Sequence, residues 1–188
     1  MHKVVKNKNY LFPMPVLMIG TYDENGKPNL MNAAWGTMED SDVILIELTK
    51  EHMTSKNIIR NKEFTVAFAD KDHVKEADYV GIVSQNDVSD KIEKSHLHYE
   101  KADGINAPLF SDFPISLNCK LERIDETNND FVVYGKIVSI SVDDKCLNSD
   151  GKLDLSFCNL ITYNSIDHSY RVLGEKVADA FKVGLELK

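Results

Sequence analysis

Residues 16–37 read VLMIGTYDENGKPNLMNAAWGT, two largely apolar segments on either side of an Asn-Gly pair. Asn25-Gly26 is a strong hairpin signal in this setting, because both residues tolerate the positive φ angles that a tight turn between antiparallel strands requires. We therefore expect a hairpin with a first strand at residues 16–22 and a return strand at residues 28–37.

The segments that follow continue the β pattern. Residues 43–48 and 64–69 are almost entirely apolar, which predicts strands that are buried on both faces. Residues 115–122 alternate apolar and polar side chains, which predicts a strand with one face in solvent, and a long strand is expected at residues 131–142. Many antiparallel strands with few helices indicate a mainly β fold, a closed or partly closed antiparallel barrel.

Three helices are expected, at residues 54–61, 73–83 and 177–185. Thr54 or Ser55 is available as N-cap of the first helix, and Gly184 as the stop of the last. The polar stretch at residues 84–112 is expected to be irregular with one short helix.

Composition sets limits on function. The chain has 188 residues, with 22 Lys and Arg against 30 Asp and Glu, a net charge of −8. An acidic protein is repelled by phosphate backbones and anionic lipids, so we expect no nucleic-acid or membrane partner. No linker divides residues 1–188, so one domain is expected, with residues 1–9 as a flexible or edge segment. Three widely spaced cysteines without a metal-binding spacing favour a reducing cytoplasm.

Residues 49–58, between a buried strand and a helix start, form a candidate anion site. Free backbone N–H groups and the helix dipole attract an anion there. Hydroxyl and amide donors follow at Thr54, Ser55 and Asn57, with Lys50 or Lys56 as a cation. The alternative is that Thr54 only caps the helix and Lys56 is solvated.

Residues 29–37 form a second candidate segment. Asn, Ala and Gly within a strand pattern weaken packing and allow a flat ligand to approach the backbone closely. The alternative is an ordinary strand edge in which Trp35 belongs to the core.

The order and spacing of these segments resemble flavin reductase-like and flavoredoxin-like proteins over nearly the whole chain. The run at residues 52–58 has the pattern His-x-Thr-x-x-Asn-Ile. The other matching segments are residues 15–21, 25–26, 29–37, 63–66, 77–84, 90–91 and 170–174. The resemblance implies a Greek-key, FMN-binding antiparallel split β-barrel with a few short flanking helices. It also implies a homodimer with the flavin near the subunit interface.

The resemblance further assigns cofactor-binding residues. Thr54, Ser55 and Asn57 would contact the FMN phosphate, with His52 beside it. The ring or ribityl chain would contact Asn32, Ala33, Ala34 and Trp35, with Thr37 close by. Ser84 and Lys91 match the segment near the isoalloxazine, where a cation would stabilise the reduced, anionic ring.

Two features depart from the common pattern. Residues 38–42 are unusually acidic, and Gln85 stands where the family usually has glycine. An acidic rim repels the pyrophosphate of a pyridine nucleotide, which puts nicotinamide docking in doubt.

Other groups of residues give weaker evidence for a functional site. His96 and His98 could place two imidazoles on one face, but no third metal ligand stands at a recognised spacing. Cys119 and Cys158 lie in apolar segments and are expected to be inert core thiols. No nucleotide-binding glycine motif is present, so NADH or NADPH would stack on the flavin from an open face.

The leading functional hypothesis is an NAD(P)H:flavin oxidoreductase that passes electrons to a small-molecule or protein acceptor. No obligatory acid–base side chain is expected, because the flavin carries the chemistry. The main alternative is an electron carrier of the flavoredoxin type, with tightly bound FMN and no direct NAD(P)H activity. A haem-binding or flavin-free relative of the barrel is a third possibility.

Overall fold

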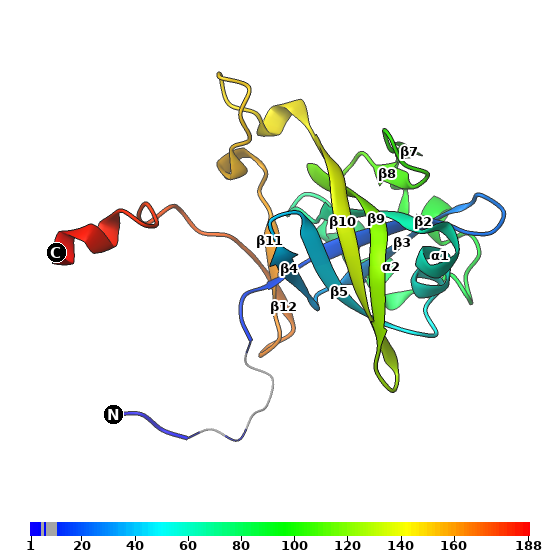
Figure 1. Cartoon of the computed structure of the whole chain (residues 1–188), viewed down its shortest axis with the longest axis horizontal. Helices are drawn as coiled ribbons and strands as arrows, with labels where there is room; N and C mark the ends of the chain where they lie inside the picture. The colour runs from blue at the N-terminus through cyan, green and yellow to red at the C-terminus, as the bar shows by residue number, and fades with distance from the viewer. Residues whose placement is uncertain (5, 7–10) are drawn as a thin grey trace.

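The computed structural model describes residues 1–4, 6 and 11–188. Its centre is a seven-stranded antiparallel sheet in the order β3-β2-β6-β9-β10-β5-β4 (Figure 1). The strands are β2 (Leu17–Tyr22), β3 (Pro28–Ala33), β4 (Gly36–Asp40), β5 (Val43–Thr49), β6 (Glu63–Phe68), β9 (Ile115–Glu126) and β10 (Asp130–Val142). The mainly β fold expected from the sequence is confirmed.

The hairpin at Asn25-Gly26 is confirmed, but the single return strand at residues 28–37 is wrong. Strands β2 and β3 pair with Tyr22 opposite Pro28, and Gly26 has a φ of 76°. The chain then leaves β3 after Ala33 and enters β4 at Gly36, on the opposite edge of the sheet. Because only two residues link the two edges, the sheet must curl until its edges approach each other.

The contact at Gly36 explains why the strand divides there. A Cβ atom on Gly36 would lie 2.5 Å from Leu17 Cδ1 and 3.1 Å from the Leu45 carbonyl oxygen. Only glycine allows this close approach of β4 to the side chains inside the curled sheet.

Two hydrophobic cores lie on the two faces of the sheet. Leu17 and Ile19 of β2 point into the curled sheet, where they pack in one cluster with Ile46, Phe64 and Val133. The alternate residues Val16 and Met18 pack on the outer face with residues of the helices, so β2 is buried on both faces.

Helices and a small hairpin surround the sheet. They are α1 (Met53–Asn61), α2 (Val74–Ile82), α3 (Lys91–Ser95), β7 (Tyr99–Lys101) and β8 (Pro108–Phe110). Helix α1 packs Ile58 against the inner cluster, while α2, α3 and β8 pack on the outer one. The first two helices are confirmed, but the N-cap prediction is wrong. His52 occupies that position without a side-chain cap bond, and Thr54 and Ser55 lie inside the first turn with other partners.

Neither face of the first half of β9 is exposed to solvent. Ser116 and Asn118 are both about 1% exposed, and the Asn118 side chain donates to the Ser139 and Ser141 hydroxyls. The expected alternation is wrong here because the neighbouring strands bury this face, and Ser116 Oγ and Asn118 Oδ1 have no hydrogen-bond partner among the described residues.

The C-terminal part adds a second sheet and two turns. The sheet has the order β1 (Met14–Pro15), β11 (Ile161–Asn164) and β12 (Ser169–Val172), so β12 lies in the closing segment expected at residues 170–174. The turns are 3₁₀ helices, η1 (Asp144–Cys146) and η2 (Leu155–Phe157).

Both ends of the chain extend away from the body on the side of β11 and β12 (Figure 1). The helix expected at residues 177–185 is wrong, since only a 3₁₀ turn, η3 (Val183–Leu187), forms. The apolar side chains of Val177 and Phe181 are 94% and 99% exposed, and an isolated short helix is not stable without packing. Residues 5 and 7–9 of the expected N-terminal segment lie outside the described residues.

Among the described residues, no helix has the length and apolar character needed to cross a bilayer.

Candidate functional site

Two adjoining cavities open between β3, the start of α1 and the end of α2. The larger has a volume of about 630 Å³ and the smaller about 240 Å³. Both are lined by Met31, Asn32, His52, Gly81 and Ile82. The two therefore form one continuous site with a small polar end and a large aromatic end.

Lys91 is the central feature of the polar end. Its side chain lines the small cavity and is only 2% exposed. No described residue accepts a hydrogen bond from its ammonium group or pairs with it, and burial lowers the pKa of Lys91 to about 8. A buried cation without a counter-charge is costly, so an anion bound at this end would stabilise the charged form of Lys91.

Thr54 and Ser84 provide hydroxyl groups at the same end. Thr54 Oγ1 accepts a 2.8 Å hydrogen bond from the buried side chain of Asn29, which leaves the hydroxyl hydrogen for a ligand. Ser84 Oγ accepts from the Asn86 N–H at 3.1 Å, with the same consequence. Asn29 was not among the predicted site residues, although it begins the segment singled out in the sequence.

Other residues expected at the phosphate do not line either cavity. Ser55 donates to the Thr49 carbonyl at 2.8 Å, and Asn57 donates to Thr21 Oγ1 at 3.0 Å, so both hold α1 in place. Lys50 pairs with Glu126 at 3.1 Å. The lysine that lines the small cavity is therefore Lys91, and neither Lys50 nor Lys56 does so.

His52 lies where the two cavities meet. Partial burial and the charge of Lys91 lower its pKa, against a smaller opposite effect of Asp130. Its imidazole is therefore mainly neutral at pH 7, with one ring nitrogen that can donate a hydrogen bond and one that can accept.

Gln85 also faces this region. Its amide nitrogen donates to the Pro28 carbonyl at 3.3 Å, while its buried Oε1 has no hydrogen-bond partner among the described residues. An unpaired buried acceptor is rare, so a donor from a bound molecule would satisfy it.

The large cavity brings together four of the predicted ring contacts, Asn32, Ala33, Ala34 and Trp35. Thr37 does not line it and is exposed on β4. Trp35 is 50% exposed at the rim, which excludes the alternative that it is a core residue.

Asn32 is held by its neighbours. Its amide nitrogen donates to the Ala77 carbonyl at 3.1 Å and to the Tyr170 hydroxyl at 3.4 Å. A Cβ atom on Gly81 would lie 3.0 Å from the Asn32 Cβ, so glycine in α2 makes room for this side chain.

Polar residues from distant segments complete the large cavity. The Tyr170 hydroxyl donates to Asp78 Oδ1 at 2.8 Å, and burial together with Asp78 raises the pKa of Tyr170 to about 12. The Tyr163 hydroxyl lies 2.6 Å from His168 Nδ1. These four residues were missed because nothing local in the sequence connects residue 78 to residues 163–170.

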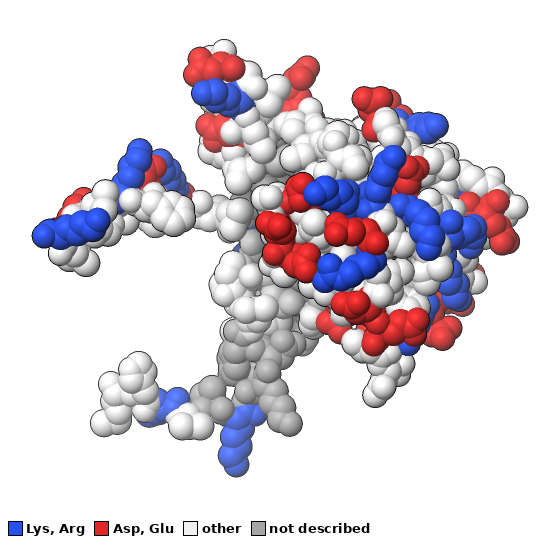
Figure 2. Space-filling view, in the orientation of Figure 1, with Lys and Arg blue, Asp and Glu red and all other residues white. Residues whose placement is uncertain are grey.

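The charge at the large cavity comes from unexpected residues. In the acidic stretch, Glu39 pairs with Arg123 at 2.8 Å and Asp42 pairs with Lys136. Figure 2 shows basic and acidic side chains interleaved over the face of β5, β9 and β10. The carboxylates that line the cavity are Glu47, Asp78 and Asp130, and none of its described lining residues is Lys or Arg.

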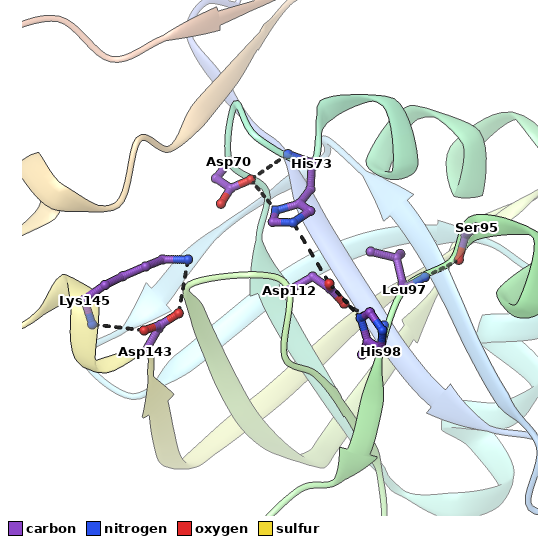
Figure 3. Close-up of polar contacts among 8 residues, drawn as sticks. All are labelled: Asp70, His73, Ser95, Leu97, His98, Asp112, Asp143 and Lys145. Carbon is purple, nitrogen blue, oxygen red and sulfur yellow. Dashed lines mark hydrogen bonds and ion pairs between the residues drawn. The ribbon is translucent and has the colours of Figure 1, made fainter.

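The His96–His98 pair lies elsewhere. His98 Nδ1 contacts Asp112 Oδ1 at 3.1 Å. A second His–Asp pair lies nearby, with His73 Nδ1 at 2.9 Å from Asp70 Oδ1 (Figure 3). Among the described residues, no three His, Cys, Asp or Glu side chains gather as a metal site.

Comparison with known proteins is consistent with this geometry. The family model described as flavin reductase like domain matches residues 9–163. Flavoredoxin of Desulfovibrio vulgaris (Miyazaki F) is 30% identical, with a TM-score of 0.91 over 98% of this chain and 100% of that chain. Flavoredoxin from Methanosarcina acetivorans is 26% identical, with a TM-score of 0.91 and full coverage of both chains.

A flavin reductase-type structure with a split barrel domain from Shewanella frigidimarina NCIMB 400 agrees in fold. It is 22% identical, with a TM-score of 0.78 over 88% of this chain and 84% of that chain. The split barrel expected from the sequence is thereby confirmed.

Proposed function

The chain belongs to the flavin reductase-like family, and from this premise we propose that it binds FMN across the two cavities and acts in electron transfer. The phosphate would lie at the polar end and the isoalloxazine at the aromatic end. The observation that carries the proposal is the buried ammonium of Lys91, which has no partner among the described residues and lines one cavity with Thr54 and Ser84.

The residues present fit such a ligand. A phosphate needs a cation and several hydrogen-bond donors, which the polar end offers in a small volume. A flat ring needs an open slot with little side-chain bulk, which Ala33 and Ala34 provide next to Trp35. We therefore reassign Lys91 from the ring to the phosphate, since it shares its cavity with Thr54 and not with Trp35.

Bound FMN would supply hydride and electron transfer, and the chain supplies positioning. Asn32, fixed by Ala77 and Tyr170, would orient the ligand between the two ends. His52 would hydrogen-bond at the junction in its neutral form. Tyr170 keeps its proton at neutral pH because its pKa is about 12, and it donates that proton to Asp78, so it holds Asn32 in place and does not act as a base.

Bound FMN could take part in two modes of electron transfer. One is NAD(P)H:flavin oxidoreduction, and the other is a protein electron carrier. The carboxylates Glu47, Asp78 and Asp130 in the large cavity favour the carrier, because they repel the pyrophosphate of NADH and NADPH. The likeness to two flavoredoxins supports the same choice.

The test is an anaerobic absorption experiment on the purified protein reconstituted with FMN. We expect a bound-flavin spectrum that dithionite bleaches and that NADH or NADPH bleaches slowly at most. Rapid bleaching, together with steady oxidation of NADH or NADPH when free FMN is added, would show the oxidoreductase instead. A protein that takes up no flavin would refute the proposal, and a Soret band would indicate haem.

We further propose a homodimer with the flavin near the interface and a cytoplasmic location. Exposed Trp35 and Ile82 at the cavity rim and the exposed apolar C-terminal segment suit contact with a second copy. All three cysteines are free, which suits a reducing compartment.

A further inference from the structure

Two of the three cysteines lie together, away from the flavin site. Cys146 ends η1 and Cys158 directly follows η2. Both side chains are buried, at 0% and 1% exposure, and they pack in one cluster with Ile115. The two thiols therefore form a pair that lines neither cavity and packs against the ends of the sheet strands.

The backbone between the two turns fixes this arrangement. The Asp154 N–H donates to the Cys146 carbonyl at 2.8 Å, and the Cys158 thiol donates to the Asp154 carbonyl at 3.5 Å. Burial and the neighbouring Cys146 thiol raise the pKa of Cys158 to about 12, so this thiol is protonated in the closed structure.

The segment that covers the thiols is suited to local opening. It consists of short 3₁₀ turns and a loop, and it projects from the body of the molecule (Figure 1). Leu153, Leu155 and Phe157 within it are 44%, 53% and 51% exposed. Local opening of these turns, without unfolding of the sheet, would bring solvent to the sulfur atoms.

A basic side chain stands beside the pair. Lys145 precedes Cys146 and pairs with Asp143 at 3.1 Å, which also caps η1 through the Lys145 N–H at 2.9 Å (Figure 3). The charge of Lys145 lowers the pKa of Cys158, against the larger effect of burial. Once opening removes that burial, the lysine favours the reactive thiolate.

We propose that Cys146 and Cys158 form a dithiol that low-molecular-weight disulfides oxidise to an intrachain disulfide. One cysteine thiolate attacks a sulfur of the small disulfide RSSR, forms a mixed disulfide and releases RS⁻. The second cysteine sulfur then attacks the mixed disulfide and releases a second RS⁻. The two cysteines lose two electrons, RSSR gains them, and the two cysteine protons go to the released thiolates.

Oxidised glutathione is the probe, applied to the reduced full-length protein. After an acid quench, the chain is unfolded, alkylated and mapped by mass spectrometry. We expect a chain that has lost two hydrogen atoms, a linked pair of peptides containing Cys146 and Cys158, and alkylation at Cys119 alone. Dithiothreitol should restore all three thiols, and the disulfide should raise the melting temperature by closing a surface loop.

Cys119 provides the matched control, because it is equally buried but lies alone in strand β9. Cys119→Ser should still form the disulfide, and Cys146→Ser should not. Low urea should accelerate oxidation of the pair while Cys119 stays unreactive, because only the turn segment opens. Since the map of the unsubstituted chain needs no variant, a folding defect in either variant leaves the test intact.

Three results would overturn the proposal. They are three alkylated cysteines after prolonged oxidation, a stable glutathione adduct on one cysteine without closure, and a disulfide that forms only between chains.

Discussion

Thr54 and Thr21 present hydroxyl groups to the same buried amide, that of Asn29, at 2.8 Å and 3.4 Å. Only Thr54 also lines the polar cavity. Thr54→Val removes its hydroxyl from the site. Because a hydrogen bond to a charged group is worth about 1.5–3 kcal/mol, we expect FMN binding to weaken roughly 10- to 150-fold in a fluorescence titration.

Thr21→Val is the matched control for that substitution. It leaves Asn57 without its 3.0 Å acceptor, so the free energy of unfolding should fall by about 1–3 kcal/mol while FMN affinity is unchanged. Riboflavin, which lacks the phosphate, should bind Thr54→Val and the parent equally. Equal weakening of both ligands would show that Thr54 supports the fold and not the phosphate.

Lys91 gives the site a characteristic pH dependence. Its pKa in the folded chain is about 8, below its ordinary value of 10.5, so between these pH values the unfolded chain binds a proton that the folded chain does not. The free energy of unfolding of the ligand-free protein should therefore rise from pH 8 to 10.5. FMN affinity should fall over the same range, up to about tenfold per pH unit, because the phosphate binds the protonated lysine.

Lys91→Met should abolish both trends and weaken FMN binding at pH 7. Lys94→Met is the control, since Lys94 lies on the same helix but is exposed and paired with Asp90 at 2.9 Å. Urea unfolding and flavin titrations across pH measure the two quantities. An FMN affinity that keeps its fall above pH 8 in Lys91→Met would remove this lysine from the phosphate site.

At the scale of single residues, the sequence located the site better than it assigned its members. A strand that runs into a helix start predicted an anion site at residues 52–57, and His52 and Thr54 of that segment line the cavities. Which side chains face the cavity depends on the direction of α1, and Ser55 and Asn57 turn toward Thr49 and Thr21. Tyr163, Asp78 and Tyr170 reach the cavity through tertiary pairing, which no local pattern reports.

At the scale of elements, α2 and β3 meet where Gly81 packs on Asn32. Gly81→Ala adds a Cβ 3.0 Å from the Asn32 Cβ, which forces that side chain to move by a few tenths of an ångström. We expect FMN and riboflavin to bind more weakly by the same factor, roughly three- to thirtyfold, because Asn32 lies between the two ends, where it would orient the part of the ligand that both flavins share.

The same substitution should not harm the helix itself. Alanine favours helix over glycine by about 1 kcal/mol, so the free energy of unfolding should hold or rise while affinity falls. This opposite sign separates a positioning effect at Asn32 from general damage. If affinity for both flavins is unchanged in Gly81→Ala, Asn32 does not orient the ligand.

Element prediction succeeded where a local rule and the tertiary fold agree. The Asn25-Gly26 turn and the apolar strands at residues 43–48 and 64–69 are of this kind. It failed at residues 28–37, because the change of sheet edge after Ala33 follows from curling of the whole sheet. It also failed at Ser116 and Asn118, which neighbouring strands bury.

At the scale of the whole molecule, the acidic stretch and the exposed apolar surface differ in how far other residues compensate them. The acidic stretch at residues 38–42 is largely paired, so it should repel the pyrophosphate of a pyridine nucleotide less than its sequence indicated. The C-terminal segment, in contrast, leaves apolar side chains uncovered. Val177, Phe181 and Leu187 are 94%, 99% and 93% exposed.

In the proposed homodimer, we expect the C-terminal segment to pack against the second copy. Apolar residues at helical spacing gain stability only when their common face is covered, so a second copy would both bury the segment and make it helical. Sedimentation should show a dimer for the full chain and dissociation at higher concentration for Phe181→Ser, with Lys182→Ser as the control. Hydrogen exchange at residues 175–185 should be slow in the dimer and fast in Phe181→Ser. A full chain that stays monomeric at every concentration, or a Phe181→Ser dimer as tight as the parent, would contradict this role, because the exposed face would then have no second copy to cover it.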